Sequence, residues 1–113
     1  MLTRVILKTD QWRVSVGLLG WGAVRALNAA GESVDATAVE KTYFLEVLRA
    51  LRQAGIRITT QSPVAVSIVT DFAKAIHQRS RRTTTAGGFA YTAFFSTYSP
   101  EETARRYIEK VSN

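Results

Sequence analysis

A run of arginines followed by aromatic residues is the part of this sequence best suited to binding chemistry. Residues 77–98 read HQRSRRTTTAGG and then FAYTAFFSTY. Cationic side chains give affinity for phosphate, and aromatic rings give stacking surfaces for bases, so the segment could hold a nucleic acid. The same pattern also arises where an ordinary helix end precedes a core strand. The sequence leaves both interpretations open.

The nucleic-acid interpretation assigns a role to each kind of residue in this region. Arginines would contact phosphates, threonine hydroxyls would donate hydrogen bonds to phosphate oxygens, and a tyrosine ring would stack on a base. Lys74, Gln78 and Arg82 would share one helical face if the helix continues past Ser80. No helix-turn-helix pattern supports a helix that reads a groove. The candidate contact residues are Lys74, Gln78, Arg79, Arg81, Arg82, Thr83, Thr84, Tyr91 and Arg57.

The whole chain is basic. Its 113 residues carry 15 Lys and Arg against 9 Asp and Glu, which gives a formal net charge of +6. Most of the cations are arginines, which bind phosphate and stack on rings better than lysines do. A GC-rich genome would favour arginine equally well. The excess is concentrated in residues 1–30 and 71–82, and one strong patch requires that these two segments meet in space.

Catalytic and metal-binding chemistry find little support in the residue types present. The absence of cysteine excludes disulfides, thiolate metal sites and cysteine nucleophiles. The single histidine, His77, is expected to be partly exposed near a helix C-terminus, without a carboxylate partner on its face. The carboxylates show no metal-ligand spacing, and the glycines of residues 17–22 form no phosphate-binding loop. We therefore predict a protein that is not an enzyme and that uses no metal or cofactor.

An apolar stretch at residues 14–24 raises the question of a signal peptide or a membrane helix. Arg4, Lys8 and Arg13 precede it, as in a secretory signal, but Asp10 interrupts the basic region. The stretch is also too short to span a bilayer. We expect a soluble, cytoplasmic protein with no membrane partner.

The N-terminal part of the chain reads most simply as a β-hairpin. Residues 2–8 and 12–18 both alternate apolar and polar side chains, with a turn between them. A short helix over residues 21–30 would follow. One helix from residue 10 to residue 30 is the competing interpretation, although its glycines would weaken it by nearly ~1 kcal/mol each.

The remaining sequence predicts three longer helices. The first covers residues 35–54 and ends at Gly55. Ser62-Pro63 starts the second, and Ser99-Pro100-Glu101-Glu102 starts the third, over residues 100–112, with a capping box. Glu40 and Asp71 are expected on solvated faces. The predicted buried residues are Phe44, Val47, Leu48 and Leu51 in the first helix, Ala65, Ile68, Val69, Phe72 and Ile76 in the second, and Ala104, Tyr107, Ile108 and Val111 in the third.

Together these elements predict one α+β domain over residues 1–113. A small, mostly antiparallel sheet would contain the N-terminal hairpin and strands near 56–60 and 89–97, and it would pack against three to four helices. Residues 79–88 are expected to form a mobile loop, rich in basic residues and glycine.

The functional hypothesis is a small, basic, non-enzymatic module that binds DNA or RNA through an Arg-rich helix end and loop. The alternative is a protein–protein adaptor, an inhibitor or a self-assembling structural subunit of the kind that mobile elements encode. The N-terminal hairpin motivates this alternative, because an exposed strand edge can pair with a second copy or another protein.

Overall fold

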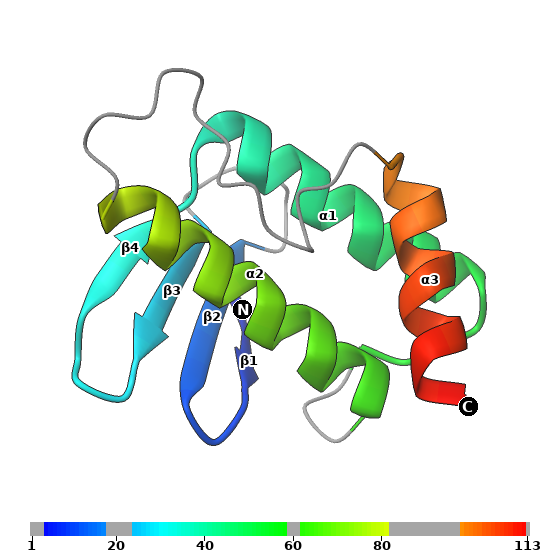
Figure 1. The fold of residues 1–113 in the computed structure, drawn as a ribbon, viewed down its shortest axis with the longest axis horizontal. Helices are drawn as coiled ribbons and strands as arrows, with labels where there is room; N and C mark the ends of the chain where they lie inside the picture. Colours follow the sequence, from blue (N-terminus) through cyan, green and yellow to red (C-terminus); the bar gives the residue numbers. More distant parts are fainter. Residues whose placement is uncertain (1–3, 18–23, 59–61, 82–97, 113) are drawn as a thin grey trace.

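The chain folds into a sheet followed by helices, which confirms the predicted α+β class (Figure 1). The computed structural model describes residues 4–17, 24–58, 62–81 and 98–112. Within these ranges the strands and helices are β1 (Arg4–Lys8), β2 (Trp12–Gly17), β3 (Arg25–Asn28), β4 (Ser33–Asp35), α1 (Ala38–Gln53), α2 (Pro63–Arg81) and α3 (Pro100–Ser112).

The four strands form an antiparallel meander in the order β1-β2-β3-β4. The predicted hairpin is therefore confirmed, and its turn is closed by Thr9, whose Oγ1 accepts a hydrogen bond of 3.0 Å from the backbone N–H of Trp12. The turn between β3 and β4 is held by Asn28, whose Oδ1 accepts from the backbone N–H groups of Ala30 and Glu32. Gly31 adopts a φ of 86° in this turn, a conformation that favours glycine.

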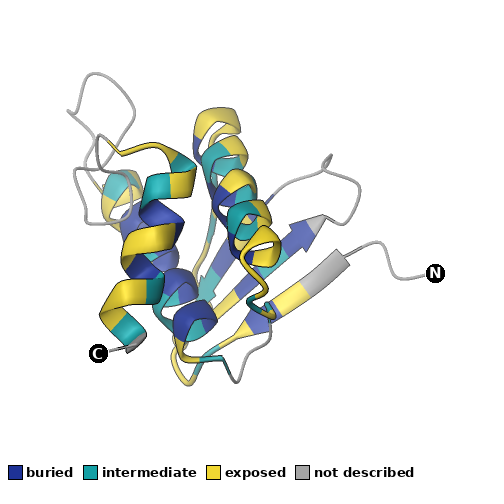
Figure 2. Cartoon of the chain, turned by 90° about the vertical axis from the view of Figure 1, so that its right-hand side faces the viewer, coloured by how far each residue is buried: buried dark blue, intermediate teal, exposed yellow. Residues whose placement is uncertain are grey.

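All three helices lie on one side of the sheet. Helix α2 crosses the sheet and contacts all four strands, while α1 and α3 pack against each other beside it (Figure 1). The rings of Phe44 and Phe72 stack between α1 and α2, with their centroids 3.9 Å apart. The strands have their main contacts with α2, so the predicted packing of three to four helices against the sheet is confirmed only in part. Buried strand residues, dark blue in Figure 2, alternate along the strands with the exposed residues Ile6, Lys8, Arg13 and Arg25, which lie on the opposite face of the sheet.

One prediction for the N-terminal part of the chain is wrong. Residues 25–28 form strand β3, so the predicted short helix over 21–30 does not exist, and the competing helix over 10–30 is excluded as well. The reason is the period of the pattern: Val24 and Ala26 are buried while Arg25 is exposed, which is the alternation of a strand. Strand β4 was not predicted, because its three residues carry only one apolar side chain.

The other predicted strands and the loop have mixed outcomes. Residues 56–58 are described but are not a strand, and residues 59 and 60 lie outside the described residues. The predicted strand at 89–97 also lies outside them. Helix α2 continues to Arg81, so residues 79–81, expected at the start of a loop, are helical. The rest of that predicted loop is outside the described residues.

Most of the predicted helical core is confirmed, although Leu48, Ile108 and Val111 are only partly buried. Phe44, Val47 and Leu51 are fully buried, as are Ile68, Phe72 and Ile76 of α2. Glu40, which was placed on the solvated face of α1, is instead 0% exposed.

The buried carboxylate of Glu40 joins three elements. Its Oε1 accepts from the backbone N–H of Thr37 at 2.8 Å and completes a capping box at the start of α1. Arg79, at the end of α2, donates to both carboxylate oxygens, from Nε to Oε2 at 3.0 Å and from Nη2 to Oε1 at 2.8 Å. The same Nη2 also donates to the carbonyl of Asp35, at the end of β4, at 2.8 Å. The fully buried Glu40 carboxylate is thus compensated by the partly buried Arg79 guanidinium, which satisfies both carboxylate oxygens.

Arg79→Ala should destabilise the fold strongly, because it leaves the Glu40 carboxylate buried without its cation. Breaking a buried ion pair from one side costs roughly 3–5 kcal/mol. Urea unfolding should show this loss, whereas Arg81→Ala, which removes an exposed arginine two residues away, should change the free energy of unfolding by less than about 0.5 kcal/mol. Equal stabilities for the two variants would contradict the assigned role of the pair.

Helix α3 is attached to both other helices by tyrosine hydroxyls. The Tyr107 hydroxyl donates to the carboxylate of Asp71 on α2 at 2.6 Å. The Tyr43 hydroxyl of α1 donates to the carbonyl of Tyr98 at 3.0 Å and lies 2.5 Å from the hydroxyl oxygen of Thr103. Burial, together with the hydrogen bond to Asp71 and the charge of that carboxylate, raises the pKa of Tyr107 well above its usual value.

Tyr107 should make the stability of the protein sensitive to alkali. Its pKa is raised in the folded state, so its contribution is complete below the unfolded pKa of about 10 and is lost as the pH rises above that value. Chemical unfolding between about pH 8 and 11 should show a steeper loss of stability for the wild type than for Tyr107→Phe. The two proteins would show parallel losses if the Tyr107 hydroxyl were ionised as easily as in an unfolded chain.

Candidate functional site

One exposed face of α2 carries three of the predicted contact residues. Lys74, Gln78 and Arg81 are all exposed and follow the i, i+4, i+7 spacing of a single helical face. They span about 10 Å along the helix axis. All nine side-chain carboxylates of the chain lie within the described residues, and none forms an ion pair with Lys74 or Arg81. We call Lys74, Gln78 and Arg81 the α2 face.

Asp71 lies one turn before Lys74 and partly offsets the positive charge of the α2 face. Its carboxylate accepts the hydrogen bond of Tyr107 and is half-buried. The positive charge of the α2 face is therefore greater near Arg81, at the C-terminal end of the helix, than near Lys74.

Arg79 does not belong to this face. Its guanidinium points toward Glu40 and the carbonyl of Asp35, and its side chain is only 21% exposed. The arginines of this cluster are thus not equivalent, because Arg79 stabilises the fold. We leave Arg79 out of the candidate contact set for this reason.

The remaining predicted contact residues are separate from the α2 face or undescribed. Arg57 is exposed in the segment that follows α1, again without an ion pair. Four predicted contacts lie outside the described residues, namely Arg82, Thr83, Thr84 and Tyr91.

His77 is buried, which corrects the expectation of a partly exposed histidine at a helix end. It is 4% exposed, its Nε2 lies 3.0 Å from the carbonyl oxygen of Ala26 in β3, and its ring meets that of Trp12 edge to face at 4.9 Å. It therefore connects α2 to the sheet and is not placed to contact a ligand at the surface.

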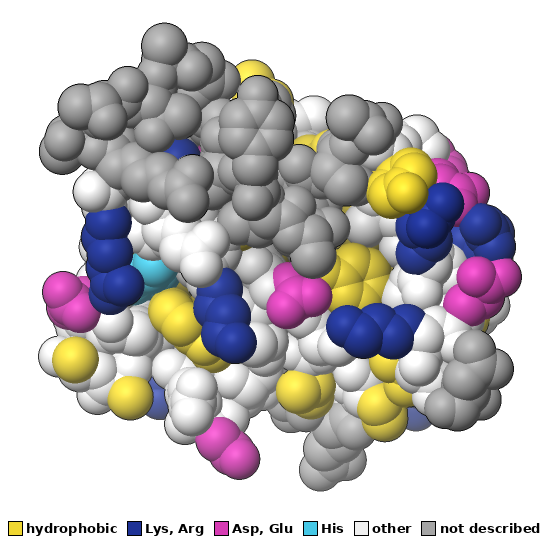
Figure 3. All heavy atoms as spheres, viewed as in Figure 1, with side chains coloured by type: hydrophobic (Ala, Val, Ile, Leu, Met, Phe, Trp, Pro, Cys, Tyr) yellow, Lys and Arg dark blue, Asp and Glu magenta, His cyan; other side chains and the backbone are white. Residues whose placement is uncertain are grey.

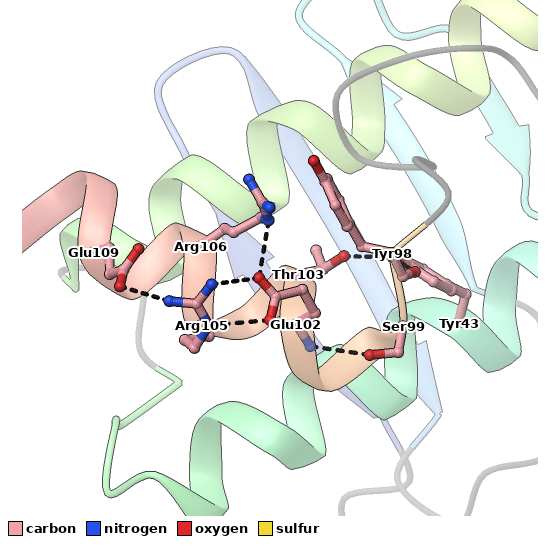
Figure 4. A network of polar contacts seen from close by, with 8 residues as sticks. All are labelled: Tyr43, Tyr98, Ser99, Glu102, Thr103, Arg105, Arg106 and Glu109. Atoms are coloured by element: carbon pink, nitrogen blue, oxygen red, sulfur yellow. Dashed lines mark hydrogen bonds and ion pairs between the residues drawn. The ribbon is translucent and has the colours of Figure 1, made fainter.

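The arginines of α3 are neutralised by carboxylates on the same helix (Figure 4). Glu102 accepts from both Arg105 and Arg106, and Arg105 also donates to Glu109. The hydrogen bond and charge of Arg105 lower the pKa of Glu102 below its ordinary value. Arg106 additionally lies over the ring of Tyr98, 3.8 Å from its centroid. The predicted capping box is present only in part, because Ser99 accepts from the Glu102 backbone N–H while the Glu102 side chain faces the arginines.

A second group of cations lies on the sheet face that no described helix covers. Lys8 and Arg13 are exposed and stand directly opposite each other on β1 and β2. Arg25, in the next row, donates to Asp35 at 2.7 Å. The helices and this outer face are on opposite sides of the sheet, so Lys8, Arg13 and Arg25 do not join the α2 face.

The charged side chains on the helix side of the molecule are dispersed. Figure 3 shows Lys and Arg separated from one another by neutral atoms, with Asp and Glu between them. Among the described residues, no group of His, Cys, Asp and Glu could hold a metal ion. The described helices also include none with the length and apolar character needed to cross a membrane.

Comparison of the chain with family models, with curated proteins and with solved structures found no match. A function for the chain is therefore inferred from the geometry of its own residues.

Proposed function

We propose that this chain is a small, non-enzymatic module that binds nucleic acid through the α2 face. The observation that carries the proposal is that Lys74 and Arg81 are exposed and lack carboxylate partners, on the same helical face as Gln78. Cations with no internal partner are available to replace the counterions of a phosphate backbone.

The contrast with the arginines that are held by carboxylates supports this assignment. Arg79 is bound to a buried carboxylate, and Arg105 and Arg106 are bound to Glu102. The sequence contains carboxylates enough to neutralise a helix surface, as α3 does, but α2 has only Asp71 among its residues. Gln78 between the two cations can donate and accept hydrogen bonds with phosphate, sugar or base edges.

A non-enzymatic role fits the placement of the titratable groups. The only histidine is buried against β3, and the buried carboxylate of Glu40 is occupied by Arg79 and the α1 cap. Neither group is exposed beside a nucleophile. A cytoplasmic location and the participation of Arg57, Arg82, Thr83, Thr84 and Tyr91 are further parts of this proposal, and DNA and RNA are both suitable partners.

Binding should weaken steeply with salt if the proposal holds. Each neutralised phosphate contributes a slope of about −0.9 in a plot of log affinity against log salt for duplex DNA. Fluorescence anisotropy with a labelled duplex, and with a labelled single strand, should show that Lys74→Ala/Arg81→Ala reduces the magnitude of this slope by roughly 2.

The matched control is Arg49→Ala/Arg52→Ala, which removes two exposed, unpaired arginines from α1. It changes the net charge equally and should leave the slope nearly unchanged. Equal losses in both double variants would mean that binding follows net charge and not the α2 face. A wild-type affinity that does not respond to salt would reject nucleic-acid binding altogether.

Self-association through the N-terminal hairpin is the second candidate function. Strand β1 is the first strand of the described sheet, and Ile6 on it is 48% exposed. An exposed apolar side chain at a sheet edge can pair with a second copy, although Lys8 on the same strand opposes such pairing.

Sedimentation velocity over a wide concentration range tests this second candidate. Self-association predicts a mass that rises with concentration, and Ile6→Lys should return the protein to a monomer without changing its fold. A mass that corresponds to one chain at all concentrations would exclude self-assembly.

A further inference from the structure

The outer face of the sheet contains a pair of like charges placed directly opposite each other on β1 and β2. Lys8 and Arg13 are direct cross-strand partners, both exposed. The neighbouring Thr9 and Trp12 form the hydrogen-bonded pair that closes the turn, so Lys8 and Arg13 occupy a non-hydrogen-bonded position, where side chains are closest. Like charges directly opposite each other destabilise a sheet.

Another cation on the same face of the sheet, Arg25, is neutralised by a carboxylate on the neighbouring strand. Arg25 on β3 and Asp35 on β4 are cross-strand partners and form an ion pair of 2.7 Å. In the row of Lys8 and Arg13, the next two residues across the sheet are Leu27 and Ser33. Asp10, in the adjoining turn, forms no ion pair with either cation. No carboxylate side chain forms an ion pair with this pair of cations in the part of the chain that the structure describes.

We infer that Lys8 and Arg13 bind the phosphate backbone of a second nucleic-acid segment, so that one chain bridges two segments. This inference rests on the proposed function of the α2 face. The α2 face and the Lys8–Arg13 pair lie on opposite sides of the sheet, because α2 packs on its inner face and both cations are on its outer face. One rigid duplex lying along α2 does not reach both surfaces. A bound phosphate between the two cations also relieves their repulsion, which makes a polyanion the partner that the charges favour.

The experiment uses the full chain and two duplexes of the same sequence, one with a donor and one with an acceptor fluorophore. Anisotropy measures binding of a single duplex, and energy transfer measures bridging. The wild type should give both signals. Arg13→Glu should reduce energy transfer at least tenfold and change single-duplex affinity by no more than threefold, since the α2 face is intact. Lys74→Ala/Arg81→Ala should weaken both signals.

Arg13→Glu also controls for folding. It replaces a like-charged pair by an opposite-charged one, so its melting temperature should equal or exceed that of the wild type. Arg49→Glu, which makes the same change of charge on α1, should retain bridging. A general effect of net charge would reduce bridging equally in both variants and would overturn the inference.

The outcomes separate this inference from the proposed function. If the wild type binds a single duplex but gives no energy transfer, or if Arg13→Glu bridges as well as the wild type, the second surface is refuted and the α2 face stands. If the wild type binds no nucleic acid, the proposed function fails and this inference fails with it. Capture of anionic vesicles or acidic peptides in place of duplexes, dependent on Arg13, would likewise refute the nucleic-acid assignment of this face.

Discussion

The buried contact between Glu40 and Arg79 is the constraint on which the arrangement of the helices depends. One carboxylate caps α1, binds the end of α2 and, through Arg79, reaches the carbonyl at the end of β4. Because an isolated charge in this position would be costly, the three elements are required to meet at one point. The contact therefore fixes the end of α2 against the start of α1, while the Phe44–Phe72 stack fixes their middles.

The same contact decides which cations of the arginine cluster remain available. Since Arg79 must face Glu40 and His77 must face Ala26, the rotation of α2 about its axis is determined at its C-terminal end. This rotation turns Gln78 and Arg81 toward solvent. In the described part of this arginine cluster, the fold thus separates the structural Arg79 from the exposed Arg81.

Local sequence patterns predicted much of this fold. The residues that they placed wrongly have contact partners far away in the sequence. The stripe of Phe44, Val47 and Leu51 and the alternation in the hairpin could be identified because each depends on neighbours a few residues apart. The burial of Glu40 and His77 could not be predicted, since the partners that accompany it are 39 and 51 residues distant in the sequence. Both residues were assigned to the surface by residue type alone. The Thr37–Glu40 spacing was a local signal, but only for the capping box at the start of α1. In the candidate site, exposure of Lys74 and Gln78 followed from helical periodicity, but the role of Arg79 required the position of Glu40.

A two-layer fold of this size also limits how its positive charge can be used. With the helices on one face of the sheet only, cations on the outer strands and cations on α2 are separated by the core, and they cannot combine into one patch. Each surface then offers few phosphate contacts, so each alone would bind weakly and with strong dependence on salt. When the two segments belong to one nucleic-acid molecule, binding of the second gains from effective concentration, because it needs no new bimolecular encounter. The division of charge between the two faces therefore suits a protein that holds nucleic-acid segments together better than one that recognises a single sequence, which would need base contacts concentrated on one surface.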